Sequence, residues 1–587
     1  MRAERAELPI ILLLAVSQGW LLYGLHHSIQ AHQWPATQPA WLLALYAVVV
    51  LMPVTLQLLA EHLRKAAVWP ILALVGAAVF YFGWHHGTAV VDSHWDRLAA
   101  SGDCFPLAFI LLVWWLHLLP FIQNRLVAGR WSGDYALLFA HSWRNIIGLA
   151  EAAVFTGLLW LILELWQALF HMLGVDYFRE LFAEPAFVYP ISAVSFGWAL
   201  HLIGSIDRLV SAVLGQVLNV LKWLGTVTGV LLVLFTIALL LKLPGLVFTG
   251  HRAIGAAWLL WLVAVMVLLL NAAFRDGAVE RPYPKGIAQG LRLAVPLLVV
   301  VAATAVYALL VRARHYGLTV ERVWAFVVAG EALIYAIGYS AAAFRRGPWM
   351  AGIARVNVAV ALALLMAISL ALTPLLSPYR LAANSQFHLA LDGRYRKPDR
   401  FLAGTPFHYL RFDSGQYGRG RLRELAGLQN HPDAENIRNW AAQALAQKTP
   451  WENPPVLDAA RRIAALAIYP AGRVVDRDLA AVLEADLARA GTGMYYLGGD
   501  SGSMAGVFVD LDGDGTEEFI VLNAQGGIVY RNSAGHWQQC GRAFERTGGV
   551  RSRQWSAIRS DLAKGAISTA APQWQDLVIG SSRFRID

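Results

Sequence analysis

The chain reads WLGTVTGVLLVLFTIALLLKL over residues 223–243, where Lys242 is the one charged residue. About 20 predominantly apolar residues let a helix cross the ~30 Å hydrocarbon core of a bilayer. Similar segments recur through a block from about Leu8 to Leu372, and we count about eleven. They are predicted at residues 8–28, 39–60, 67–85, 104–122, 146–170, 187–206, 223–243, 253–273, 290–311, 322–343 and 354–374. The expected fold class of this block is a membrane all-α helical bundle.

The composition indicates the same class. Of the 587 residues, 57% are hydrophobic and only 15% are charged, whereas about a quarter of the residues are charged in typical soluble domains. The net charge of +9 is not gathered into a Lys/Arg-rich run with interleaved aromatic residues, which excludes an ordinary nucleic-acid surface. The two cysteines, Cys104 and Cys540, lie far apart and predict no structural disulfide. The lipid bilayer is therefore the expected partner.

Two apolar segments differ from an ordinary membrane span. The N-terminus, MRAERAELP, leads into an apolar stretch as a signal peptide does, but no small-residue cleavage site follows it. We interpret it as an uncleaved first span. Residues Leu209–Leu221, LVSAVLGQVLNVL, are expected to form an amphipathic helix at the membrane surface rather than part of a span.

Loop charges predict the orientation. With the N-terminus inside, the predicted inside loops carry roughly twice as many Lys and Arg residues as the outside loops. An odd number of spans then places the tail from Ser377 onward on the outer side, which is the periplasm in a cell with two membranes. One span more or fewer would reverse this.

The tail has the character of a soluble α+β domain. Residues 377–493 are predicted to be mainly helical, with helices at Arg419–Leu428, Ala434–Gln447 and Asp476–Ala490. Residues 494–587 are predicted to form a small β-rich subdomain with an Asp-rich loop, its strands lying at Val507–Val509, Phe519–Leu522, Gly527–Tyr530, Leu577–Ile579 and Phe584–Ile586. The predicted domains are thus 1–376, 377–493 and 494–587.

Four segments carry a family resemblance. They are DYALLFAHSWRNIIGLAEAAVFTGLLWLILELWQALFHMLGVDYFRELF at Asp134–Phe182, YGLTVER at Tyr316–Arg322, YAIGY at Tyr335–Tyr339 and YLRFDSGQYG at Tyr409–Gly418. Together they resemble the bacterial membrane proteins grouped as the domain of unknown function 4153. The resemblance implies a multi-pass protein of the bacterial inner membrane with an outward soluble tail. With the loop charges, this predicts a cytoplasmic N-terminus and a periplasmic tail. It implies no activity.

The best-defined motif is VFVDLDGDGTEEFIVL, Val507–Leu522. Calcium takes six to eight oxygen ligands, and this loop offers Asp510, Asp512, Asp514, Glu518 and the Thr516 carbonyl at alternate positions. An EF-hand is excluded, because Val521 stands where that loop needs a bidentate Glu. The loop is similar to the calcium loops of FG-GAP-type β-repeats, although one copy is present. We predict a structural Ca²⁺ here; the alternative is an acidic β-hairpin turn, for which Asp-Gly is a common signal.

Histidines gather at the predicted outer ends of the first and third spans. They are His26, His27, His85, His86 and His94. Imidazoles on adjacent span ends could ligate Zn²⁺ or Cu²⁺, but neighbouring positions on a helix point apart. An interfacial belt of His beside Trp and Tyr is the alternative.

Ionisable residues inside predicted spans form a third group: Glu151, Glu164, Glu331 and His201. Such residues usually face the bundle interior and often mark ion or substrate paths; a structural hydrogen bond is the alternative. The segment His141–Asn145 is expected to be a loop at the inner mouth of the fifth span, with Arg144 as a positive anchor.

We find no phosphate-binding loop, no HExxH and no strand-linked GxGxxG, and we assign no catalytic residue. The sequence therefore favours a non-enzymatic envelope protein whose exported tail binds an envelope protein partner or senses conditions. A transporter or channel that uses the intramembrane glutamates is the first alternative. A membrane enzyme acting on a lipid-linked substrate is the second.

Overall fold

The computed structural model of the chain describes most of its length in two compact units. One unit comprises Met1–Leu389 and Phe412–Arg419, and the other comprises Ala390–Arg411 and Gly420–Asp587. We call them the bundle unit and the tail unit. The described residues are 2–90, 105–131, 134–204, 207–249, 255–277, 281–345, 349–394, 404–450, 459–488, 504–523, 526–543, 555–570, 577–579 and 582–584.

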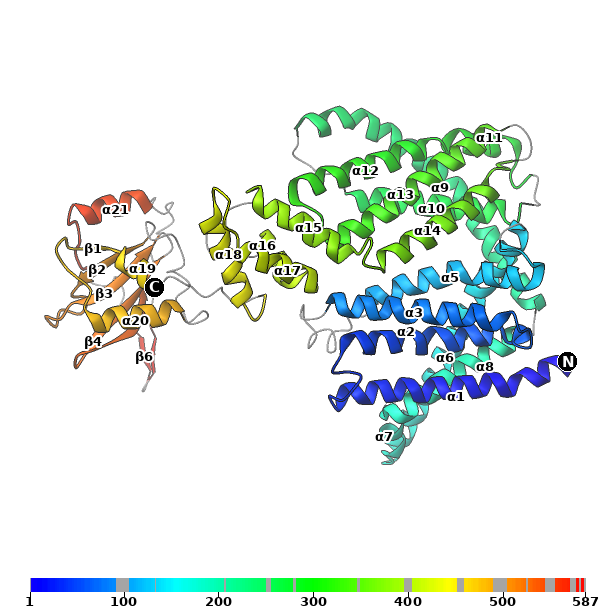
Figure 1. Cartoon of the computed structure of the whole chain (residues 1–587), viewed down its shortest axis with the longest axis horizontal. Helices are drawn as coiled ribbons and strands as arrows, with labels where there is room; N and C mark the ends of the chain where they lie inside the picture. Colours follow the sequence, from blue (N-terminus) through cyan, green and yellow to red (C-terminus); the bar gives the residue numbers. More distant parts are fainter. Residues whose placement is uncertain are drawn as a thin grey trace. The chain divides into compact units, whose positions relative to one another are not determined.

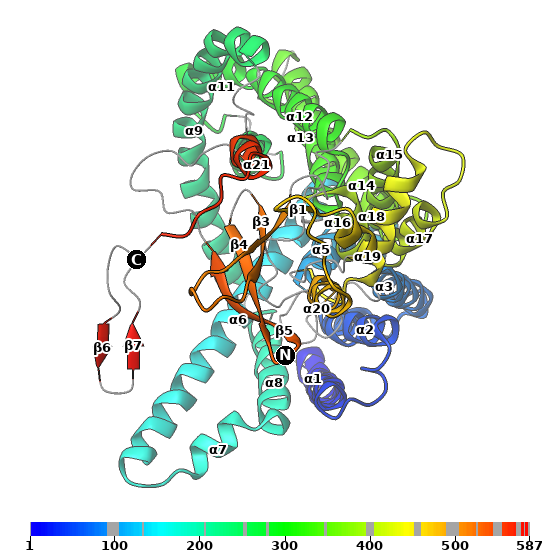
Figure 2. The same ribbon diagram turned by 90° about the vertical axis from the view of Figure 1, so that its left-hand side faces the viewer.

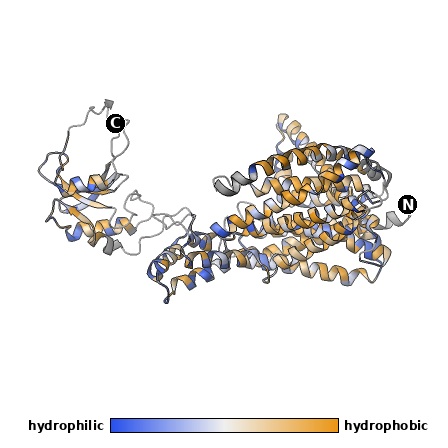
Figure 3. Ribbon diagram, turned by 90° about the horizontal axis from the view of Figure 1, so that it is seen from above, coloured by the Kyte–Doolittle hydropathy of each residue, from blue (hydrophilic) through white to orange (hydrophobic). Residues whose placement is uncertain are grey.

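The bundle unit is built from long apolar helices, which confirms the prediction of a multi-pass membrane protein. Ten helical segments among the described residues are long and apolar enough to span a bilayer, and their apolar residues run along most of their length (Figure 3). They belong to α1 (Arg2–Gln30), α2 (Pro39–Leu58), α3 (Val68–Val90), α5 (Phe105–Ala128), α6 (Tyr135–Met172), α9 (Asp207–Thr249), α10 (Ala256–Phe274), α11 (Lys285–Ala294) with α12 (Leu297–Tyr316), α13 (Val320–Phe344) and α14 (Ile353–Ala371).

The predicted eleventh span, at residues 187–206, is helix α8 (Pro185–Gly204), and it is not among these ten. Helix α8 nevertheless packs closely along α1: a Cβ placed on Gly19 would lie 2.4 Å from the Cα of Pro190, and one on Gly197 would lie 2.9 Å from the Cβ of Ala15. The order of these pairs makes α8 antiparallel to α1. A short helix, α7 (Tyr177–Ala183), joins it to α6 (Figure 2).

Two local predictions are wrong. Leu209–Leu221 is not a separate surface helix, because α9 continues through it from Asp207 to Thr249. The segment His141–Asn145 is not a loop, because α6 already begins at Tyr135. Asp134 caps that start, since its carboxylate accepts hydrogen bonds from the backbone N–H groups of Ala136 and Leu137. No helix breaker separates this start from the apolar run.

Contacts between neighbouring segments define two ends of the bundle. At one end, Lys65 Nζ donates to the Leu126 carbonyl (2.9 Å), and the Tyr283 hydroxyl donates to the Lys222 carbonyl (2.7 Å). We call this the basic end. At the other end, α3 and α14 finish and α13 begins; Figure 1 shows α2, α3 and α5 lying side by side between the two ends. This second end carries α15 (Pro378–Leu391), and we call it the tail end.

Helix α15 is held firmly to the tail end. Gln386 Nε2 donates to the carbonyls of Tyr316 (3.0 Å) and Leu318 (2.9 Å), and the Leu318 N–H donates to Ser385 Oγ (2.8 Å). These bonds satisfy the backbone of the turn between α12 and α13. The chain of the tail therefore starts from a fixed point on the bundle.

The tail unit begins with helices and ends with a sheet. Its helices are α16 (Pro406–Phe412), α18 (Ala434–Ala446), α19 (Ala459–Ala464), α20 (Arg477–Ala488), α21 (Trp555–Ala563) and most of α17 (Gly415–Ala426). The main sheet has five strands in the order β1 (Ala467–Tyr469), β2 (Ala505–Val509), β3 (Glu518–Asn523), β4 (Gly526–Ser533) and β5 (His536–Ala543). A separate pair joins β6 (Leu577–Ile579) to β7 (Ser582–Phe584).

Helices cover both faces of the main sheet. Leu479 and Leu483 of α20 pack with Phe519, Tyr530 and Trp537 on one face. On the other face, Leu562 of α21 packs with Ala505 and Val507, and Figure 1 shows α20 and α21 on opposite sides. Strand β1 joins β2 in parallel and the remaining pairs are antiparallel. The predicted helical bundle and α+β tail are thus observed, whereas strands β1 and β5 were not predicted.

Candidate functional site

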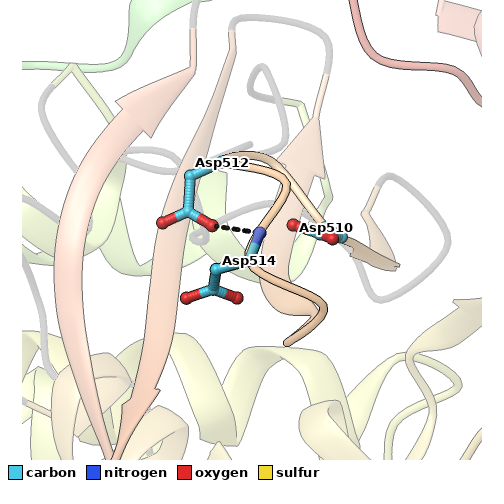
Figure 4. Close-up of side chains that lie close together, drawn as sticks. All are labelled: Asp510, Asp512 and Asp514. Atoms are coloured by element: carbon cyan, nitrogen blue, oxygen red, sulfur yellow. Dashed lines mark hydrogen bonds between the residues drawn. The ribbon is translucent and has the colours of Figure 1, made fainter.

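The Asp-rich loop connects β2 to β3, where Asp510 organises the turn. Its carboxylate accepts hydrogen bonds from the N–H groups of Gly513 (2.7 Å) and Gly515 (3.0 Å). Both glycines have positive φ, 76° and 86°, which other residues adopt only with strain. Figure 4 shows the three aspartates around this turn, with Asp512 accepting from the Asp514 N–H (3.3 Å). The sequence thus folds into a turn that its own carboxylates satisfy.

Arg531 on β4 completes this site. Its guanidinium lies 2.7 Å from Asp512 Oδ2 and 2.7 Å from Asp514 Oδ2. A hydrogen bond from the Thr516 N–H, followed by the bond from Arg531, lowers the pKa of the Asp514 carboxyl below its ordinary value. Arg531 was not predicted; the signal that could have found it is the β3–β4 hairpin, which pairs Phe519 with Tyr530 and so places Glu518 and Arg531 at adjacent positions.

Glu518 plays a different part from the three aspartates. It is 3% exposed, and its Oε2 accepts a hydrogen bond from the Leu511 N–H (2.9 Å), while Oε1 lies 3.6 Å from Arg531 Nε. The buried Glu518 carboxylate therefore holds the start of the loop, through the Leu511 N–H, close to Arg531.

Three of the five predicted calcium ligands come together. Oxygens of Asp510, Asp512 and Asp514 lie within 4.8 Å of one another, and this is the one group of three or more metal-ligating side chains within that distance among the described residues. Calcium needs further oxygens, which Glu518 and the Thr516 carbonyl would have to supply. Because Arg531 already neutralises two of the aspartates, an entering cation has to displace it.

The structure does not bring the predicted outer-face histidines into a metal centre. His26 is half-buried, with its ring 5.2 Å from that of Tyr189, and His27 is exposed. His85 is buried and His86 half-buried. His94 lies outside the described residues. No three of the described histidines share a metal-sized site.

His85 and His86 instead line a recess at the tail end. The recess is barely large enough for one water molecule, and its lining includes Ser377, Tyr379 and Trp324. Ser377 is 1% exposed and its hydroxyl has no hydrogen-bond partner among the described residues. No carboxylate, lysine or arginine belongs to this lining, so the recess suits a small neutral polar group rather than a free ion.

The intramembrane glutamates occupy three different surroundings. Glu331 on α13 and Glu151 on α6 are half-buried, and each has a carboxyl oxygen without a hydrogen-bond partner among the described residues. Glu164 lies on the exposed side of α6 and accepts a hydrogen bond from Gln167. Ala152, next to Glu151, packs with α8, whereas the neighbours of Glu331 pack with α10 and α12. The described contacts therefore do not join the three glutamates into one path.

The two remaining candidates lie near helix ends. His201 is half-buried near the end of α8, and Arg144 lies in the first part of α6 with an interaction partner. Neither is grouped with the glutamates by a described hydrogen bond.

A polar cluster near the basic end was not predicted. Asn357 Nδ2 donates to the Tyr135 hydroxyl (2.8 Å) and to Asn271 Oδ1 (2.7 Å), while the Tyr339 hydroxyl lies 2.6 Å from Asn357 Oδ1. These side chains come from α6, α14, α10 and α13. We call Tyr135, Asn271, Tyr339 and Asn357 the Tyr–Asn cluster. Isolated Asn and Tyr residues in apolar runs were its only signal in the sequence.

Comparisons with known proteins add no further assignment. The chain matches no protein-family model, no curated protein and no solved structure. The resemblance to the family of the domain of unknown function 4153 and the likeness to an FG-GAP-type loop stay predictions.

Proposed function

We propose that the chain is a non-enzymatic, multi-pass protein of the bacterial inner membrane whose exported tail binds an envelope partner and passes its state to the bundle. One observation carries this proposal. The segment Phe412–Arg419 groups with the bundle unit, although the chain before and after it belongs to the tail unit. The chain of the tail is thus anchored twice to the bundle, through α15 and through this segment.

The second anchor sits directly on the end of α3. Gly415 has a φ of 54°, and a Cβ there would lie 1.8 Å from the Ala89 carbonyl oxygen. Two residues later, the Tyr417 hydroxyl lies 3.5 Å from His85 Nε2. Burial raises the pKa of the Tyr417 hydroxyl above its ordinary value. Because His85 also lines the recess, a change at this anchor reaches the recess directly.

Loop charges support an exported tail. Arg64, Lys65, Arg125 and Arg130 flank the same helix ends that the Lys65–Leu126 bond joins at the basic end, and short cytoplasmic loops are rich in such residues. The tail leaves from the opposite end. We propose that the Asp-rich loop binds Ca²⁺ as a structural ion of the tail, because extracellular calcium modules need only weak affinity.

Two glycine substitutions test the second anchor. Gly415→Ala forces a Cβ into the Ala89 carbonyl, whereas a Cβ on Gly420, in the same helix, meets nothing within 4 Å. We expect Gly415→Ala to speed amide hydrogen exchange in residues 85–90 of the intact chain, and Gly420→Ala to leave it unchanged. Equal exchange rates in both variants would show that the segment Phe412–Arg419 is not anchored on the end of α3.

Partner binding needs a separate test. Val474 in the tail unit is 81% exposed, which makes it a suitable site for a photo-crosslinking amino acid in living cells. We expect a protein adduct from position 474 and none from the control position Leu231, a 56% exposed residue of α9 that lipid would cover. No adduct from tail position 474 would contradict partner binding at this face.

A further inference from the structure

Glu331 lies near the middle of its span. It stands 11 residues after the start of α13 and 13 before its end, so it is about 17 Å from one end and about 20 Å from the other at 1.5 Å per residue. Its carboxyl oxygen Oε1 is buried and has no hydrogen-bond partner among the described residues. A bare carboxylate in an apolar interior is costly, and such groups pair, coordinate a cation or take up a proton.

The helices around Glu331 offer it no counter-charge. Ala329, Ala332 and Ala336 of α13 belong to a core that α10, α12 and α14 complete with apolar residues, including Val263, Val301, Ala302, Ala305 and Ile353. Among the described residues, no charged group acts on the Glu331 carboxyl. Glu331 acts electrostatically on Tyr335, which follows it on α13, and Tyr335 in turn interacts with Tyr339 and with Tyr135 of α6. The Glu331 carboxylate therefore has no cationic partner among the described residues.

A row of polar groups leads from Glu331 to the basic end. Tyr335 and Tyr339 follow at one-turn intervals on the same face of α13, with ring centroids 5.5 Å apart. The Tyr339 hydroxyl then enters the Tyr–Asn cluster, lying 2.9 Å from Asn271 Oδ1. Tyr135 closes the row at the first residue of α6, and Asp276 acts on it electrostatically from beyond the end of α10.

The row runs in one direction only. Towards the tail end, the next positions on the same face of α13 are Val327 and Val328. They belong to the apolar run VWAFVVAG, residues 323–330, which contains no titratable residue. Towards the basic end, Tyr339 is fully buried yet bonded to two amides. Polar side chains within spans can form proton relays, whereas an aliphatic path offers no group that accepts a proton.

We propose that Glu331 is a proton-binding site at the membrane midplane, reached from the basic end through Tyr335 and the Tyr–Asn cluster. The ligand is a proton, and its binding converts the carboxylate to a neutral acid with no other bond made or broken. Such a site lets the bundle couple a proton to a movement of α13. This inference is independent of the exported tail, and its failure would leave the proposed function standing.

Infrared spectroscopy of the intact purified chain in bilayers tests the proton site. A protonated carboxyl gives a C=O stretching band that is lost on ionisation. We expect Glu331→Gln to remove one such band, Glu331→Asp to restore it at a shifted position, and the control Glu164→Gln to retain it. A band unaltered by Glu331→Gln would overturn the proposal.

The route is tested by exchange into heavy water, which shifts the same band. We expect Tyr339→Phe, which keeps the ring and removes the hydroxyl, to slow this exchange at least tenfold, and Tyr307→Phe, at an exposed position of α12, to leave it unchanged. Equal exchange rates in both variants would overturn the route through the cluster. Thermal unfolding of each variant excludes misfolding as the cause.

Discussion

Glu331 of α13 has a buried carboxyl oxygen without a hydrogen-bond partner among the described residues, whereas the aspartates of the β2–β3 loop all accept backbone hydrogen bonds. The loop carboxylates also have Arg531 as a counter-ion, and water reaches them. Glu331 has neither a counter-ion among the described residues nor an aqueous surrounding. This difference in surroundings is why we propose a proton for the first site and a cation for the second, although both are built from carboxyl groups.

The largest expected effect comes from Tyr339. It is fully buried and its hydroxyl bonds two asparagines. Tyr339→Ala leaves a cavity and removes the hydroxyl that contacts Asn357 Oδ1, although Asn357 Nδ2 still donates to Asn271 Oδ1. We expect it to lower the free energy of unfolding by about 3–5 kcal/mol, chiefly through the cavity. Thermal unfolding of the intact chain in detergent measures this. A loss below about 1 kcal/mol would mean that the cluster is not packed as described.

The next effect distinguishes Glu518 from its neighbour. Glu518→Ala leaves the Leu511 N–H without its acceptor in a partly buried position, and such a loss costs about 1–3 kcal/mol at most. Glu517→Ala removes only an exposed ion pair with Arg473, which is worth about 0–1 kcal/mol. Calorimetry of the tail transition compares the two. Equal losses would show that Glu518 does not support the loop.

A smaller effect concerns calcium. Arg531 competes with a cation for Asp512 and Asp514, so we expect Arg531→Ala to raise the calcium affinity of the loop roughly tenfold. Isothermal titration of the intact chain measures it, with Asp512→Ala/Asp514→Ala as the variant that binds none. Calcium binding that Arg531→Ala weakens would contradict this competition.

The smallest effect is the pH dependence of the loop. The pKa of Asp514 is lowered in the folded chain, so the folded loop is stabilised above the ordinary Asp range and loses that stability as pH falls through the lowered value. Arg531 is one cause of the shift, hence Arg531→Ala should make the loss begin at a higher pH. Carboxyl footprinting by mass spectrometry measures the protonation of Asp514 as a function of pH in the two chains. Identical titrations of the two chains would exclude the contribution of Arg531.

The sequence predicted what depends on local pattern. Ten of about eleven apolar spans were found by length and hydropathy, and Asp510–Asp514 by spacing. It failed where distant residues meet. Asn357 and Tyr135 are 222 positions apart, and Arg531 reaches the aspartates only through a hairpin register. Helix α8 is a further example, since it packs on the distant helix α1 at small residues such as Gly19 and Gly197.

The side of the membrane on which the tail lies decides whether the Asp-rich loop meets external calcium and whether the basic end faces the cytoplasm. Cys540 on β5 is a free cysteine at an exposed position next to the strand of Arg531. Partial burial of its sulfur raises the thiol pKa, so labelling is best done at mildly alkaline pH. In a chain with Cys104→Ser, we expect an impermeant maleimide to label Cys540 in intact spheroplasts. In a second chain, which carries Cys104→Ser, Cys540→Ser and Arg130→Cys, we expect the maleimide to label position 130 only after the spheroplasts are lysed. Labelling of Cys540 only after lysis would contradict the exported tail.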